Sequence, residues 1–209
     1  MGRYLGPLTR VSRRLGVFVG GSLKAFNKRN FPPGQHGRTQ GRKRKLSDYA
    51  IRLQEKQKLR YLYGGLREGQ FKRYFDEAAR IAGNKGGNTG EILLQLLERR
   101  LDNVVYRLGF AKTRRQARQM VVHGHFLVNG RRVNKPAYQV DVGDVIELRE
   151  KSKNSPVFKE NLENKDLRTV PEWLELDKEN FKGRVVALPE KVELEIPVDV
   201  QLIIEYYSG

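Results

Sequence analysis

The chain has 209 residues, which is enough for one or two domains with buried cores. Its 41 lysines and arginines outnumber 24 acidic residues and give a net charge of +17, so nucleic acid or another anionic surface is the expected partner. The absence of cysteine excludes disulfides and thiolate metal sites; because no stretch approaches the roughly 18 apolar residues of a membrane span or resembles a signal peptide, we expect a cytosolic protein.

The positive charge is concentrated in two parts of the sequence. Residues 1–60 hold 16 basic and 2 acidic residues, residues 99–150 hold 11 and 5, and residues 151–209 hold 9 and 12. A need for solubility alone would not segregate charge in this way. The pattern indicates two anion-facing regions and a C-terminal segment that faces elsewhere.

The first 46 residues contain 12 basic residues and no acidic one. One interpretation is a disordered basic tail, because like charges repel each other and little apolar surface is available to bury. The other is an arm that becomes ordered against RNA phosphates, which Phe18, Phe26 and Phe31 favour because aromatic rings among cations can pack or stack. The candidate RNA-binding residues of this arm are Arg3, Arg10, Arg13, Arg14, His36, Arg42, Lys43, Arg44 and Lys45.

A helix is predicted directly after the arm. Ser47 is a suitable N-cap, and Asp48 places a negative charge in the first turn, where the helix dipole favours it. The helix should stop at Gly64-Gly65. Because it continues the basic run of the arm, we expect RNA contacts from Tyr49, Arg52, Lys56 and Lys58.

Two further helices are predicted before residue 99. Apolar residues recur at spacings of three and four from Phe71 to Ile81, and Gly83 should end this second helix. Its aromatic residues are expected in the core. The loop GNKGGN at 83–88 lacks the Gly-Lys-Ser/Thr ending of a phosphate loop. A third helix, amphipathic, should begin at Thr89.

The stretch 99–150 carries the most specific local pattern. Thr113 and Gln116 form a capping box at the start of a short basic helix that runs to His123. Its expected apolar stripe consists of Ala117, Met120, Val121 and Val122.

A hairpin should follow this helix directly. Gly124 is placed for a left-handed C-cap. Asn129-Gly130 favours a type I′ turn between two strands, since both turn residues need positive φ. A second turn at 141–144 leads to a strand at 145–148. We expect helix and hairpin to present guanidinium groups to a sugar-phosphate backbone; the candidate RNA-binding residues here are Arg114, Arg115, Arg118, His123, His125, Asn129, Arg131 and Arg132.

The pattern after residue 150 is mixed. Ser155-Pro156 predicts a helix start, and residues 184–188 predict a strand. Trp173 is expected as a core or interdomain anchor. Residues 202–207 suit either a helix or a strand, and the sequence does not decide between them.

Five stretches can be set beside a known family. They are MGRYLGP at 1–7, PPGQHG at 32–37, SDYAIRLQEKQKLRYLYG at 47–64, LERRLDNVVYRLGFAKTRRQARQMVVHGHFLVNGRRV at 97–133, and IEYYS at 204–208. Together they resemble the bacterial ribosomal protein four family of the small subunit over the full length. The central stretch resembles the small RNA-binding domain named after that family, which also occurs in pseudouridine synthases and some aminoacyl-tRNA synthetases.

The resemblance implies an α+β fold with a helical lobe and an RNA-binding lobe of helices packed on a small antiparallel sheet. A basic N-terminal arm would span 1–46. The helical lobe would span 47–98 and be joined by the segment from about 196–209. The RNA-binding domain would span 99–162, and a connecting segment with strands packed on that lobe would span 163–195.

The resemblance also implies a structural constituent of the small ribosomal subunit with no enzymatic activity. Such a protein binds 16S rRNA early in assembly, at a multi-helix junction of the 5′ domain. It lines the mRNA entry side with neighbouring proteins three and five, and in some relatives it represses translation of its own mRNA. The implied partners are therefore 16S rRNA, proteins three and five, and mRNA at the entry channel, with no membrane.

No metal or cofactor is expected. Some relatives carry a Cys-x-x-Cys motif near residue 9 and two further cysteines before the PPGQHG motif, and these bind zinc. Thr9 and Ser12 stand at that spacing here, and oxygen ligands alone would not make such a site. His123 and His125 have no third ligand nearby in the sequence, so we interpret them as groups at the start of the hairpin.

Two other classes of protein fit this sequence less well. An RNA-modifying enzyme that docks through the central unit would need a second domain with convergent acid, base or nucleophile residues, whereas a helical lobe and tails account for the remaining segments. Asp102 is expected to cap its helix or to pair with Arg99 or Arg107. A membrane-surface protein would need an amphipathic helix with large apolar residues beside its lysines, and the sequence lacks such a helix.

Overall fold

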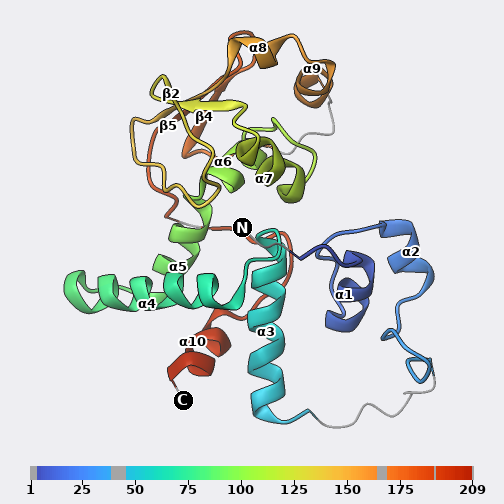
Figure 1. The fold of residues 1–209 in the computed structure, drawn as a ribbon. Helices are drawn as coiled ribbons and strands as arrows, with labels where there is room; N and C mark the ends of the chain where they lie inside the picture. The colour runs from blue at the N-terminus through green and yellow to red at the C-terminus, as the bar shows by residue number, and fades with distance from the viewer. Residues whose placement is uncertain (1–3, 39–45, 164–168, 191, 209) are drawn as a thin grey trace. The chain divides into compact units, whose positions relative to one another are not determined.

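The computed structural model describes residues 4–38, 46–163, 169–190 and 192–208 (Figure 1). The chain divides into two compact units, one formed by 1–90 with 193–209 and the other by 91–192. The fold is α+β, with helices and a five-stranded antiparallel sheet, which confirms the predicted class. Among the described residues, no helix has the length and apolar character needed to cross a membrane.

The first unit is helical. Its elements are α1 (Leu8–Leu15), α2 (Leu23–Lys28), α3 (Asp48–Leu62), α4 (Glu68–Lys85), the beginning of α5 (Thr89–Glu98), and α10 (Val200–Ser208).

The predicted start and stop signals of α3 are present. The Ser47 hydroxyl accepts a hydrogen bond from the Ala50 amide at 3.3 Å, as an N-cap should. Gly64 and Gly65 follow the helix with φ of 79° and 74°, a left-handed conformation that glycine adopts without strain. The sequence prediction for this helix is therefore confirmed at both ends.

The predicted end of α4 at Gly83 is wrong, because the helix continues to Lys85 and Gly86 follows it with φ of 74°. A glycine inside a helix costs about 1 kcal/mol relative to alanine. Phe71 and Phe75, which are buried, anchor the helix upstream, and this packing outweighs the local preference at Gly83.

Residues 200–208 form a helix, which settles the choice that the sequence left open. α10 packs on the other helices of the unit through aromatic side chains: the Tyr207 ring stacks on Phe75 with centroids 4.7 Å apart, and Ile203 is fully buried. In Figure 1, α10 lies beside α3 although some 140 residues separate them in the sequence.

The arm contains two helices that the sequence analysis did not predict. Val11 and Leu15 of α1 are buried and pack against Tyr61 of α3. The interpretation of this segment as a disordered tail is therefore wrong for its described residues. Apolar residues at positions 8, 11 and 15 recur at helical spacing, and the dense positive charge obscured this signal.

The second unit is built on a sheet with strand order β2-β1-β3-β5-β4, in which all neighbours are antiparallel. The strands are β1 (Phe126–Val128), β2 (Arg131–Arg132), β3 (Val145–Leu148), β4 (Leu174–Asp177) and β5 (Lys182–Val185), and the helices are most of α5, α6 (Leu101–Arg107), α7 (Arg114–Val122), α8 (Glu150–Lys153) and α9 (Pro156–Glu163).

One face of the sheet forms the core with α6, α7 and α9. Phe126 and Ile146, both fully buried, point into this core from neighbouring strands. Gly183 of β5 is required where Leu108 presses on the sheet, since a Cβ there would lie 2.4 Å from the Leu108 side chain. Asn129 and Gly130 have φ of 50° and 75°, which confirms the predicted type I′ turn.

The segment after residue 150 was only partly predicted. The helix beginning at Ser155-Pro156 is confirmed as α9, and Trp173 is buried in the core of the unit. The strand predicted at 184–188 is wrong in its bounds, because β5 begins at Lys182 and ends at Val185. α8 and β4 were not predicted; both are only four residues long.

Candidate nucleic-acid interface

The start of α7 is fixed by side chains close to it in sequence. The Thr113 hydroxyl accepts from the Gln116 amide at 3.1 Å, and the Gln116 side chain accepts from the Lys112 amide at 2.7 Å. The predicted capping box is therefore present, with its return bond displaced by one residue from the usual position. These bonds hold the first turn of the basic helix rigidly.

The end of α7 is fixed by backbone hydrogen bonds. Gly124 has φ of 71°, as predicted, and the amides of Gly124 and His125 bond to the carbonyls of Val121 and Met120 at 2.8 and 3.2 Å. This pattern is a Schellman motif, and it turns the chain directly into β1. The predicted apolar stripe is correct except at Val122, which is exposed because it points away from the sheet.

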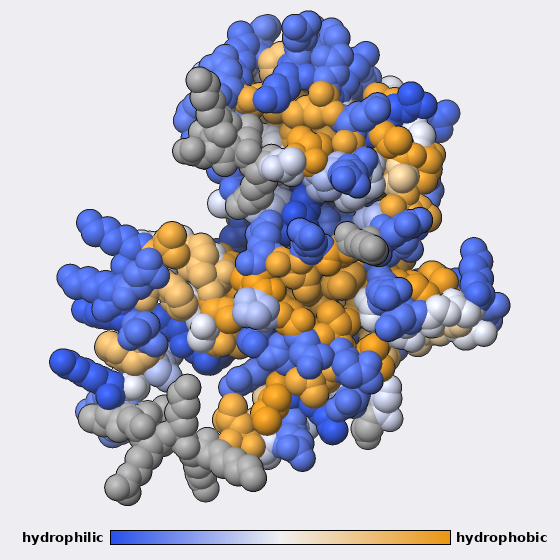
Figure 2. Space-filling model, turned by 180° about the vertical axis from the view of Figure 1, so that it is seen from behind, coloured by the Kyte–Doolittle hydropathy of each residue, from blue (hydrophilic) through white to orange (hydrophobic). Residues whose placement is uncertain are grey.

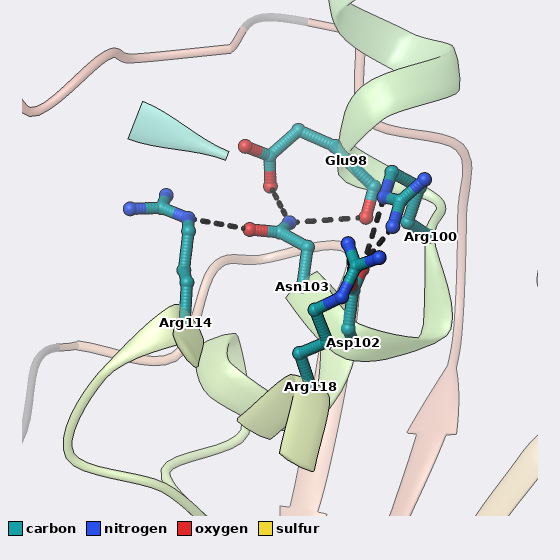
Figure 3. A network of polar contacts seen from close by, with 6 residues as sticks. All are labelled: Glu98, Arg100, Asp102, Asn103, Arg114 and Arg118. Atoms are coloured by element: carbon teal, nitrogen blue, oxygen red, sulfur yellow. Dashed lines mark hydrogen bonds and ion pairs between the residues drawn. The ribbon is translucent and has the colours of Figure 1, made fainter. Parts of the chain in front are cut away.

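A buried polar network lies between α6 and α7 (Figure 3). Arg100 is fully buried and donates two hydrogen bonds to the Asp102 carboxylate, at 3.0 and 2.7 Å. A guanidinium nitrogen of Arg118 lies 3.8 Å from the same carboxylate. The buried positive charge of Arg100 thus has its counter-charge within the unit.

The network continues through Asn103. Its amide donates to the Glu98 carboxylate at 2.8 Å, and its carbonyl oxygen accepts from the Arg114 guanidinium at 2.9 Å. Glu98 also accepts two hydrogen bonds from Arg107, and the Arg114 guanidinium lies 4.4 Å from the Tyr106 ring centroid. Side chains from α5, α6 and α7 are joined in this way.

The partners predicted for Asp102 are therefore wrong. Asp102 pairs with Arg100, while Arg99 pairs with the exposed Asp141 and Arg107 with Glu98. Arg100 lies directly before α6 in an extended backbone conformation. Its side chain folds back over the first turn of the helix, which contains Asp102. An acidic side chain in that turn is also favoured by the helix dipole.

The prediction that α7 and the hairpin present five accessible guanidinium groups is wrong for two of them. Arg114 and Arg118 are only 9% and 8% exposed. They are four residues apart and share one helix face, and that face is turned toward α6. Arg115, which is next in sequence, is partly exposed. Arg114 and Arg118 therefore contribute to the fold, which the sequence analysis did not foresee.

Two adjacent accessible cations of this unit lie on the hairpin. Arg131 and Arg132 form the edge strand β2, and both are exposed. The Arg132 guanidinium donates to the His123 carbonyl at 3.4 Å and lies over Gly124, where a Cβ would be 2.3 Å from its Nε. His123 is itself exposed. The carbonyl end of α7 thus positions a cation at the surface.

Asn129 has an intramolecular role. Its amide donates to Asp144 at 2.7 Å, and its carbonyl oxygen accepts from the Val145 amide at 2.9 Å. These bonds tie the hairpin turn to the start of β3.

His125 is also engaged within the unit. Its Nδ1 lies 2.9 Å from the Ser152 hydroxyl. Burial, followed by the nearby His123, Arg149 and Arg132, lowers the pKa of His125. This side chain therefore resists protonation in the folded protein.

In the first unit, Lys56, from which we expected an RNA contact, is buried in the structure. Lys56 is only 2% exposed; its ammonium donates to Glu68 at 2.8 Å and lies 4.0 Å from the Tyr206 ring centroid. It shares a helix face with the buried Leu59, and this face packs toward α10. Burial opposes ionisation of Glu68, but hydrogen bonds from Lys56 and Tyr207 outweigh it and lower the pKa of this carboxyl.

The other candidates on α3 lie nearer the surface. Tyr49 is exposed. Arg52 pairs with Glu205 of α10 at 3.0 Å, and Lys58 pairs with Glu55 at 2.5 Å. Part of the positive charge of α3 is therefore offset within the unit.

Most of the cations among the described residues of the arm lie at the surface. Arg10 and Arg14 are exposed, as is His36. Arg13 donates to the Phe31 carbonyl at 3.0 Å, and its guanidinium lies 4.8 Å from the Phe31 ring centroid. The arm is at the left edge of Figure 2, where hydrophilic side chains project along its outer side.

The candidates from the sequence left out four exposed cations among the described residues of the arm: Lys24, Lys28, Arg29 and Arg38. Lys28 and Arg29 lie at the end of α2, shortly before the PPGQHG stretch, and that position was the signal that could have identified them. The candidates that lie outside the described residues are Arg3, Arg42, Lys43, Arg44 and Lys45.

The zinc site of some relatives does not fit this chain. The Thr9 hydroxyl accepts from the Ser22 amide at 3.0 Å, while the Ser12 hydroxyl accepts from the Val19 amide and donates to the Gly20 carbonyl at 3.1 and 2.9 Å. Both hydroxyls are already engaged in hydrogen bonds with backbone groups. Across the described ranges, no three His, Cys, Asp or Glu side chains gather to hold a metal ion.

Comparisons with known proteins cover the whole chain. Residues 3–98 match the model described as ribosomal protein S4/S9 N-terminal domain, and residues 99–146 match the S4 domain. Proteins named small ribosomal subunit protein uS4 are 81% identical in Persephonella marina, over the full length of both chains, and 62% identical in Aquifex aeolicus, over all of this chain and 99% of the relative. The protein of that name from Thermus thermophilus is 53% identical over the full length of both.

Proposed function

This chain belongs to the uS4 family of small ribosomal subunit proteins, and on that premise we propose that it binds 16S rRNA early in assembly, at a multi-helix junction of the 5′ domain. It is a structural, non-enzymatic ribosomal protein with an S4-type RNA-binding domain, and it acts in the ribosome in the cytoplasm. The proposed organisation is a basic arm at 1–46, a helical lobe at 47–98 with 196–209, the RNA-binding domain at 99–162, and a packed connecting segment at 163–195.

The observation that carries the proposal is the pair of accessible cation groups, one in each unit. Arg131 and Arg132 are held at the surface by a rigid hairpin, whereas Arg10 and Arg14 lie on the arm. A folded protein that neutralises phosphates from two rigid elements fixes its position on RNA, since phosphate contacts set register and orientation. We assign the RNA-facing role to these residues together with His123 and the partly exposed Arg115.

The finer partnerships of the family are also proposed here. Neighbouring proteins five and three, and mRNA at the entry channel, are the expected contacts in the assembled subunit. The acidic excess after residue 150 supports a protein-facing role for that segment, because basic ribosomal neighbours would complement it. Repression of its own mRNA would use the same RNA-binding surfaces.

Binding of the full chain to two RNAs of similar length tests the proposal. One is the 5′ domain of 16S rRNA and the other is its 3′ domain. We expect tighter binding to the 5′ domain by at least about tenfold at physiological salt, with log K falling linearly with log salt. Equal affinity for both RNAs would contradict the proposed site, because charge alone does not select a junction.

A further inference from the structure

Four cations surround one groove of the arm. The groove lies between α1 and the end of α2 and has a volume of about 550 Å³; its lining includes Arg10, Arg13, Lys28 and Arg29. No acidic residue occurs anywhere in residues 1–46. No carboxylate of the arm itself can therefore offset these charges.

The shape of the groove is fixed by bonds within the arm. Thr9 also lines the groove, and its hydroxyl accepts a hydrogen bond at 3.0 Å from the amide of Ser22, the N-cap of α2. Gly21 has φ of 98°, and a Cβ there would lie 2.6 Å from the Thr9 amide nitrogen, so only glycine permits this approach. On the other side, Arg13 reaches the Phe31 carbonyl at 3.0 Å.

The cations are thus brought together by a built structure and not by chance on a flexible chain. Four positive charges around one cavity repel each other, and arginine cannot lose its proton in the physiological range. An anion in the groove removes this repulsion. Guanidinium groups bind phosphate oxygens in paired hydrogen bonds, and the volume suits a phosphate with part of an attached nucleotide.

We propose that this groove is a discrete phosphate site, formed before RNA binds, that takes a phosphate group of the RNA backbone. The inference rests on the proposed RNA-binding function and adds a defined pocket to it. Thr9 and Ser12, which stand where some relatives have metal-binding cysteines, keep the pocket in shape through hydroxyl-to-backbone hydrogen bonds.

Titration of the full-length, ¹⁵N-labelled protein with sodium pyrophosphate at constant ionic strength tests the site without RNA. We expect saturable shifts of the amide resonances of residues 7–34. The double variant Arg10→Ala/Arg29→Ala should bind pyrophosphate at least about tenfold more weakly, from the loss of two charge-assisted contacts. The matched control is Lys72→Ala/Arg73→Ala, which removes two exposed cations of α4 and should leave the titration unchanged.

Two further variants separate binding from folding. Lys28→Ala removes one exposed groove cation and should weaken pyrophosphate binding while the spectrum stays dispersed. Thr9→Val should widen the groove and weaken binding, whereas Thr9→Ser should restore it. Shifts that fail to saturate, that spread over both units, or that persist unchanged in the groove variants would overturn the site.

Binding to 16S 5′-domain RNA decides what occupies the groove. The Arg10→Ala/Arg29→Ala variant should lower the salt slope by about 1.4–1.8, for two lost contacts. If the variant loses pyrophosphate but binds the RNA with unchanged affinity and slope, the pocket serves a free phosphate compound and RNA is the wrong occupant. If the unmodified protein does not prefer the 5′ domain, the proposed function fails, which is a separate result from failure of the groove.

Discussion

Replacing Asp102 with asparagine would test how much the buried network stabilises the second unit. Arg100 is fully buried and donates twice to the Asp102 carboxylate. Without that charge, a buried cation loses its nearest counter-charge, and breaking a buried pair in this way costs about 3–5 kcal/mol. With an unfolding slope of about 2 kcal/mol per molar urea, the midpoint should fall by roughly 1.5–2.5 M.

The matched control is Asp141→Asn, which removes the partner of the neighbouring Arg99. The Asp141 side chain is 76% exposed, and exposed pairs contribute only about 0–1 kcal/mol, so the midpoint should move by less than about 0.5 M. Trp173 is the only tryptophan and is buried in the core of the same unit, so its fluorescence reports this transition. Equal midpoints for the two variants would refute a stabilising role for the network.

Three other outcomes are expected. Arg131→Ala/Arg132→Ala should leave the urea midpoint unchanged and lower the salt slope of RNA binding by about 0.7–0.9 per lost contact; an unchanged slope would place the RNA face elsewhere. Because burial lowers the pKa of His125, the unfolded chain binds that proton more readily, so stability should fall as the pH drops below about 6.5. His125→Asn, which can still reach Ser152, should lose less stability between pH 7.5 and 5.5 than the unmodified protein, and equal losses would contradict this. A chelator should leave thermal melting unchanged, since hydroxyl-to-backbone bonds shape the arm; stoichiometric zinc in the purified protein would show otherwise.

Short-range chemistry made part of the fold predictable from the sequence. The cap at Thr113, the C-cap at Gly124 and the turn at Asn129-Gly130 each depend on residues within five positions of one another. Such signals act in almost any tertiary context, and all three are present. The same reasoning placed α3 between Ser47 and the glycine pair at 64–65.

Charge burial was not predictable in the same way. Lys56 is enclosed by Tyr206, which is 150 residues away in the sequence. The residues that flank Lys56 in the sequence do not indicate this contact. Arg114 is buried through Asn103 and Tyr106, which belong to another helix. We expected basic residues such as Lys56 and Arg114 to be accessible. Whether such a residue is buried depends on which face of its helix packs against the rest of the unit.

Because α10 (Val200–Ser208) packs on α3, the first unit cannot be completed during synthesis until the end of the chain is made. The second unit can therefore be completed before the first. A chain made from its N-terminus exposes all of residues 91–192 before α10 emerges, and domains generally fold as units as they appear. Until then Lys56 lacks the Tyr206 ring and Phe75 lacks Tyr207. A product that stops before residue 200 therefore carries a finished second unit and an open apolar face on the first, the kind of surface that chaperones and proteases act on.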